Sequence, residues 1–210
     1  MSDLNYWLLF ISTAFALNIA PGPDLLYILT KTMANGKKVG IASALGVCTG
    51  ALFHVFLAAF GLSAIIASSA IAFTIVKVVG ACYLIFLAYQ SFRSSGTNLD
   101  VSNEVQSKET LFSAFKQGVL IDILNPKVAI FFMAFLPQFI RSDHGSVPFQ
   151  LLYLGLIIVA IAIIVEVVYV LLASKLTEKV RGSKKISMWL DRVVGTVFLA
   201  LGIKLATTST

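Results

Sequence analysis

The segment Asn18-Ile19-Ala20-Pro21-Gly22-Pro23-Asp24 places helix breakers and an acid inside an apolar run that is long enough to cross a membrane. A second segment, Asp122-Ile123-Leu124-Asn125-Pro126-Lys127, interrupts another such run. Proline removes a backbone donor and frees a carbonyl, and hydrocarbon tolerates unpaired backbone only within protein or against a wet cavity. Interrupted helices at corresponding places in two halves of a chain are typical of a transporter's binding site. We therefore expect proline-broken helices in the first and fourth membrane spans.

The composition is that of an integral membrane protein. Hydrophobic residues make up 58% of the 210 residues and charged residues 12%, whereas soluble domains carry about 25% charge. The net charge is +6, but the basic residues cluster in loops beside apolar runs. Basic loops in such places report topology and contact with anionic lipid, so we expect a lipid bilayer and no nucleic acid as partner.

Six segments have the length of a membrane helix, about 20 mostly apolar residues. They are residues 4–29, 40–66, 70–92, 112–140, 149–174 and 187–206. The first lacks the basic start of a cleavable signal peptide, so we interpret it as a retained span. The polar stretch 94–110 separates two groups of three spans, 1–93 and 111–210, within a single transport domain, 1–210.

The distribution of Lys and Arg predicts the orientation. The loops after the first, third and fifth spans hold eleven Lys and Arg residues, and the opposite side has only Arg141 and Lys204. The positive-inside rule then places both termini outside the cytoplasm.

The two halves share a pattern. Lys77-Val78-Val79-Gly80 matches Arg192-Val193-Val194-Gly195, and Asn18 matches Asp122 on the same frame. Each half has three spans, an odd number, so the second half must be inserted upside down. We therefore predict an all-α fold of six transmembrane helices that form two inverted three-helix repeats.

Charges inside membrane spans are costly, and each is a functional hypothesis. Asp122 lies near the middle of the fourth span, where a carboxylate could receive a substrate ammonium or a proton. Alternatively, it could pair with a lysine or cap the broken helix. Glu166 lies deep in the fifth span and suits a proton carrier or a counter-ion to Lys127 or Arg192. His54 is either a packed core histidine or a member of a proton relay.

Four further charges have alternative interpretations. Lys127 directly follows Pro126, where a cation opposes the helix dipole unless an anion such as a substrate carboxylate lies nearby. Asp24 follows Pro23, where an acid suits the dipole in any case, and we interpret it as a candidate gate or anchor charge. Lys77 and Arg192 lie about 10 Å from a span edge at 1.5 Å per residue, so we interpret them as anchors or gate charges.

The cysteines and small residues carry less information. Cys48 and Cys82 are isolated in apolar segments, without metal or redox spacing, so we expect packed core residues and neither metal nor cofactor. Ala42, Gly46 and Gly50 form a small-residue face that suits an internal helix contact or a homodimer.

Three motifs together carry a family resemblance: N-x-x-P-G-P-D-L-L from Asn18, K-x-x-G-A-x-Y-L from Lys77, and L-N-P-K-V-A-I-F-F…L-P-Q-F from Leu124. They resemble the LysE/RhtB family of amino-acid exporters, and the likeness extends from Asn18 to Gly202. Ala88 stands where that family usually has glycine, which concerns only local packing. The resemblance implies a bacterial inner-membrane exporter, not an enzyme, that moves amino acids or their derivatives outward on the proton gradient. The substrate-binding positions that it implies are Asn18, Pro21, Gly22, Pro23, Asp122, Asn125, Pro126 and Lys127.

These observations lead to a mechanistic hypothesis with open alternatives. The broken helices hold an amino-acid zwitterion, and protonation of Asp122 or Glu166 releases it. The few intramembrane acids favour neutral substrates such as threonine, homoserine or leucine over lysine. A metal-ion exporter of similar build and an intramembrane thiol oxidoreductase that uses Cys48 and Cys82 are the alternatives.

Overall fold

A computed structural model describes residues 3–20, 22–62, 70–93, 109–141 and 143–175, and residues 192, 196, 199 and 203 singly. All regular elements in these ranges are helical and none is a strand. The all-α class expected from the sequence is therefore confirmed. Most of the predicted linker and of the sixth span, 187–206, lies outside the described residues.

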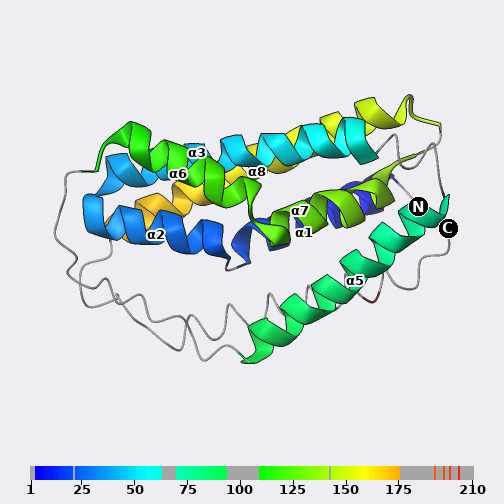
Figure 1. Ribbon diagram of the computed structural model, residues 1–210, viewed down its shortest axis with the longest axis horizontal. Helices are drawn as coiled ribbons and strands as arrows, with labels where there is room; N and C mark the ends of the chain where they lie inside the picture. Colours follow the sequence, from blue (N-terminus) through cyan, green and yellow to red (C-terminus); the bar gives the residue numbers. More distant parts are fainter. Residues whose placement is uncertain are drawn as a thin grey trace.

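The elements run back and forth along the long axis of the molecule (Figure 1). The main helices are α1 (Asp3–Ile19), α2 (Pro23–Asn35), α3 (Lys37–Phe56), α5 (Ala70–Arg93), α6 (Leu111–Ile123), α7 (Pro126–Ile130) and α8 (Val147–Lys175). A π-helical turn, Leu57–Leu62, extends α3. A π-helical turn, Phe131–Phe135, and a 3₁₀ turn, Leu136–Phe139, extend α7.

Two pairs of consecutive helices are bent at a short break. The axis turns by 54° between α1 and α2, and by 49° between α6 and the segment Pro126–Phe139. At the second break the Asn125 side chain caps α7, since its Oδ1 accepts from the Lys127 amide at 3.0 Å. Pro126 then occupies the first turn, where its missing N–H costs nothing. Local capping chemistry therefore stops α6 and starts α7 in a new direction.

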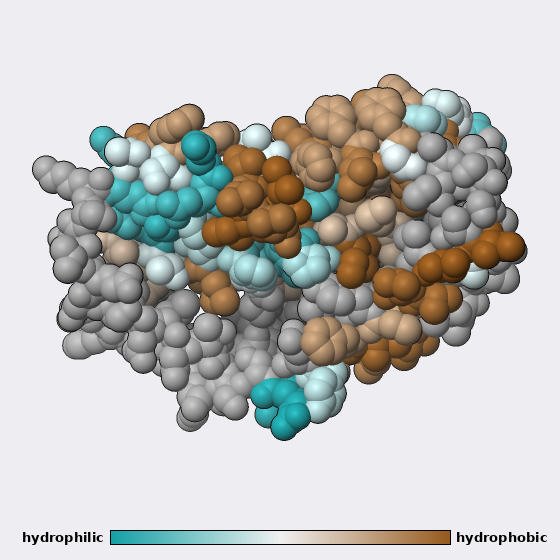
Figure 2. Space-filling model, viewed as in Figure 1, coloured by the Kyte–Doolittle hydropathy of each residue, from teal (hydrophilic) through white to brown (hydrophobic). Residues whose placement is uncertain are grey.

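The helices have the dimensions of membrane spans. Among the described residues, Lys37–Leu62 and Val147–Lys175 are each long and apolar enough to cross a bilayer, and there are four such spans if each bent pair counts as one. Large apolar side chains such as Phe60, Phe112 and Ile164 are exposed. Figure 2 shows hydrophobic residues over much of this face, with hydrophilic residues gathered toward the end where α2, α3 and α6 meet. This distribution fits a protein surrounded by lipid.

Helix α3 packs against α6 at very short range. A Cβ atom added to Gly50 would lie 2.7 Å from the Val119 carbonyl oxygen of α6, and one added to Gly46 would lie 2.2 Å from that of Phe115. Real Cβ atoms do not approach so closely, so both positions require glycine. These two members of the small-residue face therefore serve an internal contact that brings α3 against the end of α6.

Candidate functional site

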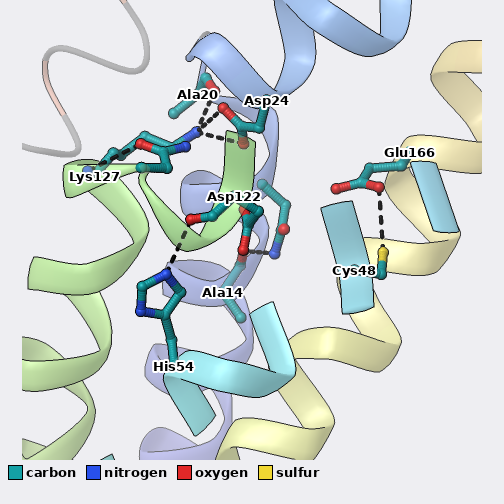
Figure 3. A network of polar contacts seen from close by, with 10 residues as sticks. Ala14, Ala20, Asp24, Cys48, His54, Asp122, Lys127 and Glu166 are labelled. Atoms are coloured by element: carbon teal, nitrogen blue, oxygen red, sulfur yellow. Dashed lines mark hydrogen bonds and ion pairs between the residues drawn. The ribbon is translucent and has the colours of Figure 1, made fainter. Parts of the chain in front are cut away.

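A buried ion pair joins the two helix breaks (Figure 3). Lys127 Nζ lies 3.1 Å from Asp24 Oδ1 and 3.0 Å from Oδ2. It also donates to the Ala20 carbonyl oxygen at 3.1 Å. Lys127 is only 4% exposed, and Asp24 is buried as well. One ammonium group therefore connects the end of α1, the start of α2 and the start of α7.

Helix electrostatics explain this arrangement. Lys127 lies in the first turn of α7, where the positive end of the helix dipole disfavours a cation, whereas Asp24 suits the first turn of α2. Ala20 follows the last residue of α1, where carbonyl groups lack helical partners. A Cβ atom at Gly22 would lie 2.3 Å from Asp24 Oδ1 and 2.7 Å from Lys127 Nζ, so the pair can form only beside glycine.

Asp122 lies at the end of α6 and is 2% exposed. Its Oδ2 atom is buried and has no hydrogen-bond partner among the described residues. A buried polar atom without a partner is expensive and calls for an explanation. A ligand's hydrogen-bond donor or a proton at this oxygen would therefore remove that cost.

His54 contacts Asp122 through the main chain. Its Nε2 atom donates to the Asp122 carbonyl oxygen at 3.0 Å, because a carbonyl can only accept. In a neutral ring, Nδ1 is then an acceptor, and it is buried without a partner in the described part of the chain. The imidazole stacks on Phe132 with ring centroids 6.2 Å apart. His54 is thus both a packed histidine and a neighbour of the acid.

Glu166 has an unexpected partner. Cys48 Sγ on α3 donates to Glu166 Oε2 on α8 at 3.2 Å, and Glu166 is 6% exposed. The expectation that Glu166 could be the counter-ion of Lys127 is not met, since the carboxylate beside Lys127 is that of Asp24. The residues Cys48 and Glu166 are 118 positions apart, and no spacing in the sequence could have revealed the contact.

These groups border one small cavity. Its volume is about 20 Å³. One water molecule needs about 10–15 Å³, so the cavity holds roughly one water. Its walls combine polar and apolar side chains from α1, α2, α3, α6, α7 and α8. The polar ones are Asn18, Asp24, Asp122, Lys127 and Glu166. An amino acid does not fit this conformation, in which the site is closed.

The charges around the cavity are unequal. Three carboxyl groups and one ammonium line it, and the ammonium is already paired with Asp24. Within the described ranges, no group of three or more His, Cys, Asp or Glu side chains could hold a metal ion. The arrangement is suited to taking up protons or a ligand's ammonium group.

The remaining predicted site residues are more scattered. Asn18 lines the cavity, and its amide donates to the Ala14 carbonyl at 2.8 Å. The Nδ2 atom of Asn125 is buried without a partner among the described residues. Arg192 is exposed. Pro21 and the side chain of Lys77 lie outside what the structure describes.

Comparison with known proteins identifies the family. The family model for the LysE type translocators matches residues 15–209. The chain is 30% identical to the homoserine/homoserine lactone efflux protein of Salmonella typhimurium, over 96% of each chain. It is 32% identical to an uncharacterized membrane protein of Vibrio cholerae, over 98% of each chain, and 33% identical to the membrane protein YrhP of Bacillus subtilis, over 94% of this chain and 96% of YrhP. No solved structure matches significantly. The chain therefore belongs to the LysE type translocators, as the resemblance of its motifs indicated.

Proposed function

We propose that this protein exports amino acids or their small derivatives across the bacterial inner membrane, in exchange for protons that enter. Membership of a translocator family supports transport rather than catalysis. Relatives named homoserine/homoserine lactone efflux proteins, about 30% identical, support a small amine-bearing substrate.

The observation that carries the proposal is the unpartnered carboxylate oxygen of Asp122 beside the closed cavity. An ionised Asp122 accepts hydrogen bonds from the α-ammonium group of a substrate. A protonated Asp122 has lost the charge that attracts it. Substrate and proton therefore compete for one group, and this competition is the minimal requirement for antiport.

The substrate carboxylate interacts with Lys127 in this scheme. Because Lys127 is already paired with Asp24, the substrate carboxylate must displace Asp24 or bind the ammonium group together with it. Displacement separates α2 from α7 and enlarges the cavity. The Asn125 side-chain amide, which has no partner among the described residues, and the backbone amides in the first turn of α2 complete the carboxylate site. Asn18, Pro21, Gly22, Pro23 and Pro126 shape its backbone.

Two further groups serve proton coupling. Glu166 borders the same cavity and accepts a hydrogen bond from the Cys48 thiol. His54 donates to the Asp122 carbonyl oxygen, and its buried Nδ1 has no partner among the described residues, so we assign it to proton exchange beside Asp122. In the proposed topology of six spans in two inverted repeats, both termini face the periplasm.

Reconstitution into proteoliposomes tests the proposal. Vesicles that contain the wild-type protein should exchange labelled homoserine for unlabelled homoserine, and a pH gradient should drive net transport. Asp122→Asn should abolish the response to the pH gradient. Asp143→Asn is the matched control, because it makes the same chemical change at a side chain that is 75% exposed. A panel of homoserine, homoserine lactone, threonine, leucine and lysine then defines the substrate. Full proton-driven transport by Asp122→Asn would refute the assignment.

A further inference from the structure

A second and much larger hollow opens at the end of the molecule where α1 and α8 begin. Its volume is about 440 Å³, whereas the cavity beside Asp122 has a volume of about 20 Å³. Small-molecule sites generally have volumes of about 300–1,000 Å³. None of the described residues lines both spaces, so the hollow is separate from the site described above.

Aromatic side chains form much of its wall. Tyr6 and Trp7 come from the first turns of α1, and Phe149 and Tyr153 come from the first turns of α8. Trp7 and Tyr153 meet edge to face, with ring centroids 6.3 Å apart. Such rings hold the apolar part of a ligand and attract an ammonium group to their faces.

Charges of both signs meet at this hollow. Arg141 Nη1 donates to Asp3 Oδ1 at 2.6 Å, and the guanidinium carbon lies 3.7 Å from the centre of the Tyr6 ring. The Asp3 side chain is 81% exposed. An exposed pair of this kind is weakly held, so a ligand can exchange with it at little cost. The guanidinium has five N–H donors; the pair uses one, and Nη1 also lies 3.3 Å from His144 Nε2, which lines the hollow.

The position of Arg141 is fixed by its own main chain. The buried Gln150 side chain accepts from the Arg141 amide at 2.9 Å and donates to the Arg141 carbonyl at 2.8 Å. It also donates to the Gly145 carbonyl at 3.0 Å. The turn that carries the guanidinium is therefore tied to the first turns of α8. Because the backbone of Arg141 is already held, binding a ligand orders only its side chain.

We infer that this hollow binds a small zwitterion that carries a primary ammonium group and an oxyanion. Arg141 receives the oxyanion, Asp3 receives the ammonium group, and the aromatic wall packs against the carbon atoms between and beyond them. Two sources supply this chemistry: a free amino acid and the ethanolamine headgroup of a phospholipid. The inference does not depend on transport through the central cavity.

Tryptophan fluorescence tests the inference, because Trp7 lines the hollow. The Trp189→Phe variant leaves Trp7 as the chain's only tryptophan. Homoserine is titrated from the micromolar to the millimolar range against this protein in detergent. In parallel, the protein is placed in nanodiscs of phosphatidylglycerol with either phosphatidylethanolamine or phosphatidylcholine. Choline lacks the N–H donors that Asp3 requires, so it is the control for the ammonium contact.

A saturable homoserine response identifies a free amino acid as the ligand. A change of Trp7 emission in ethanolamine discs but not in choline discs identifies the lipid headgroup. Arg141→Gln and Asp3→Asn should each weaken the response, since each removes a charge-assisted contact. For homoserine, the apparent Kd should rise at least tenfold. For the lipid, the difference in emission between ethanolamine and choline discs should fall at least tenfold. Lys116→Gln, which removes an exposed charge on α6 outside the wall of the hollow, should not weaken it.

The inference is wrong if neither probe changes Trp7 emission, or if the response survives unweakened in either Arg141→Gln or Asp3→Asn. Helical circular dichroism and elution as a single species establish that these variants are folded. The Asp122→Asn variant should keep the Trp7 response even though it loses proton-driven transport. A failure of this inference is thereby distinguished from a failure of the proposed function.

Discussion

Breaking the buried Lys127–Asp24 pair should destabilise the protein strongly, because Lys127→Met leaves a carboxylate buried without its cation. Removing one partner of a buried pair costs about 3–5 kcal/mol, and an aspartate in the middle of a membrane helix costs about 2.5–3.5 kcal/mol on insertion scales. The two estimates overlap near 3 kcal/mol. That value corresponds to about a hundredfold change in the folding equilibrium constant, at about 1.4 kcal/mol per factor of ten.

The double variant Lys127→Met with Asp24→Asn gives the sharper result. It removes both charges, and the main loss that remains is the hydrogen bond to the Ala20 carbonyl. An unsatisfied buried acceptor costs about 1–3 kcal/mol. We therefore expect the double variant to be more stable than Lys127→Met alone, by about 1–2 kcal/mol from the middle of these ranges. If the second substitution restores part of the lost free energy of unfolding, the loss arises from the interaction between the two charges and not from either residue alone.

Reversible unfolding in mixed micelles, followed by helical circular dichroism, measures these free energies. Lys116→Met is the matched control, since Lys116 is exposed on α6, and surface substitutions usually change stability by less than about 0.5 kcal/mol. Interhelical hydrogen bonds in membrane proteins contribute about 0.6 kcal/mol on average. A cost of that size for Lys127→Met, or a double variant less stable than this single variant, would refute the reasoning.

Three further outcomes are expected. Gly50→Val should cost about 1–3 kcal/mol in the same unfolding assay through overpacking between α3 and α6, and a neutral result would contradict the close approach. Cys48→Ser should retain transport because its hydroxyl still donates to Glu166. Cys48→Ala, which removes the donor, should lose about 1 kcal/mol of stability. Loss of transport in the serine variant would instead favour a redox role for Cys48. The hydrogen bond from Arg141 lowers the pKa of Asp3 below 3.8, so this ion pair is intact at neutral pH and is lost only as the pH falls through the lowered pKa. In an NMR titration of the Asp3 carboxyl group, Arg141→Gln should move the pKa back toward 3.8, and an unchanged pKa would contradict the contact.

The sequence predicted the all-helical class, the membrane setting and the family because these depend on local information. Apolar runs of about 20 residues report a span whatever surrounds them. The proline motifs around Asn18 and Asn125 predict breaks in the first and fourth spans because proline and a capping side chain act within a few residues. The orientation and the inverted repeat also come from local counts, and they remain predictions.

Local sequence could not predict which side chains pair with one another inside the site. From sequence, Lys127 had several possible partners, among them Asp122, Glu166 and a substrate carboxylate. The fold placed it against Asp24, 103 positions away, because the break after α1 brings an unpaired carbonyl and an acid to the same point. The Cys48 contact with Glu166 is equally distant, and nothing in the apolar surroundings of either residue indicates it.

The sequence by itself thus determined which residues are expensive to bury: Asp24, Asp122, Lys127 and Glu166. Their cost arises from transfer out of water and does not depend on the fold. Only the tertiary structure decided which of these costs are offset by a partner, because distance and direction set the energy of each contact. Asp24 and Lys127 offset one another, while Asp122 keeps an unpartnered oxygen beside the cavity.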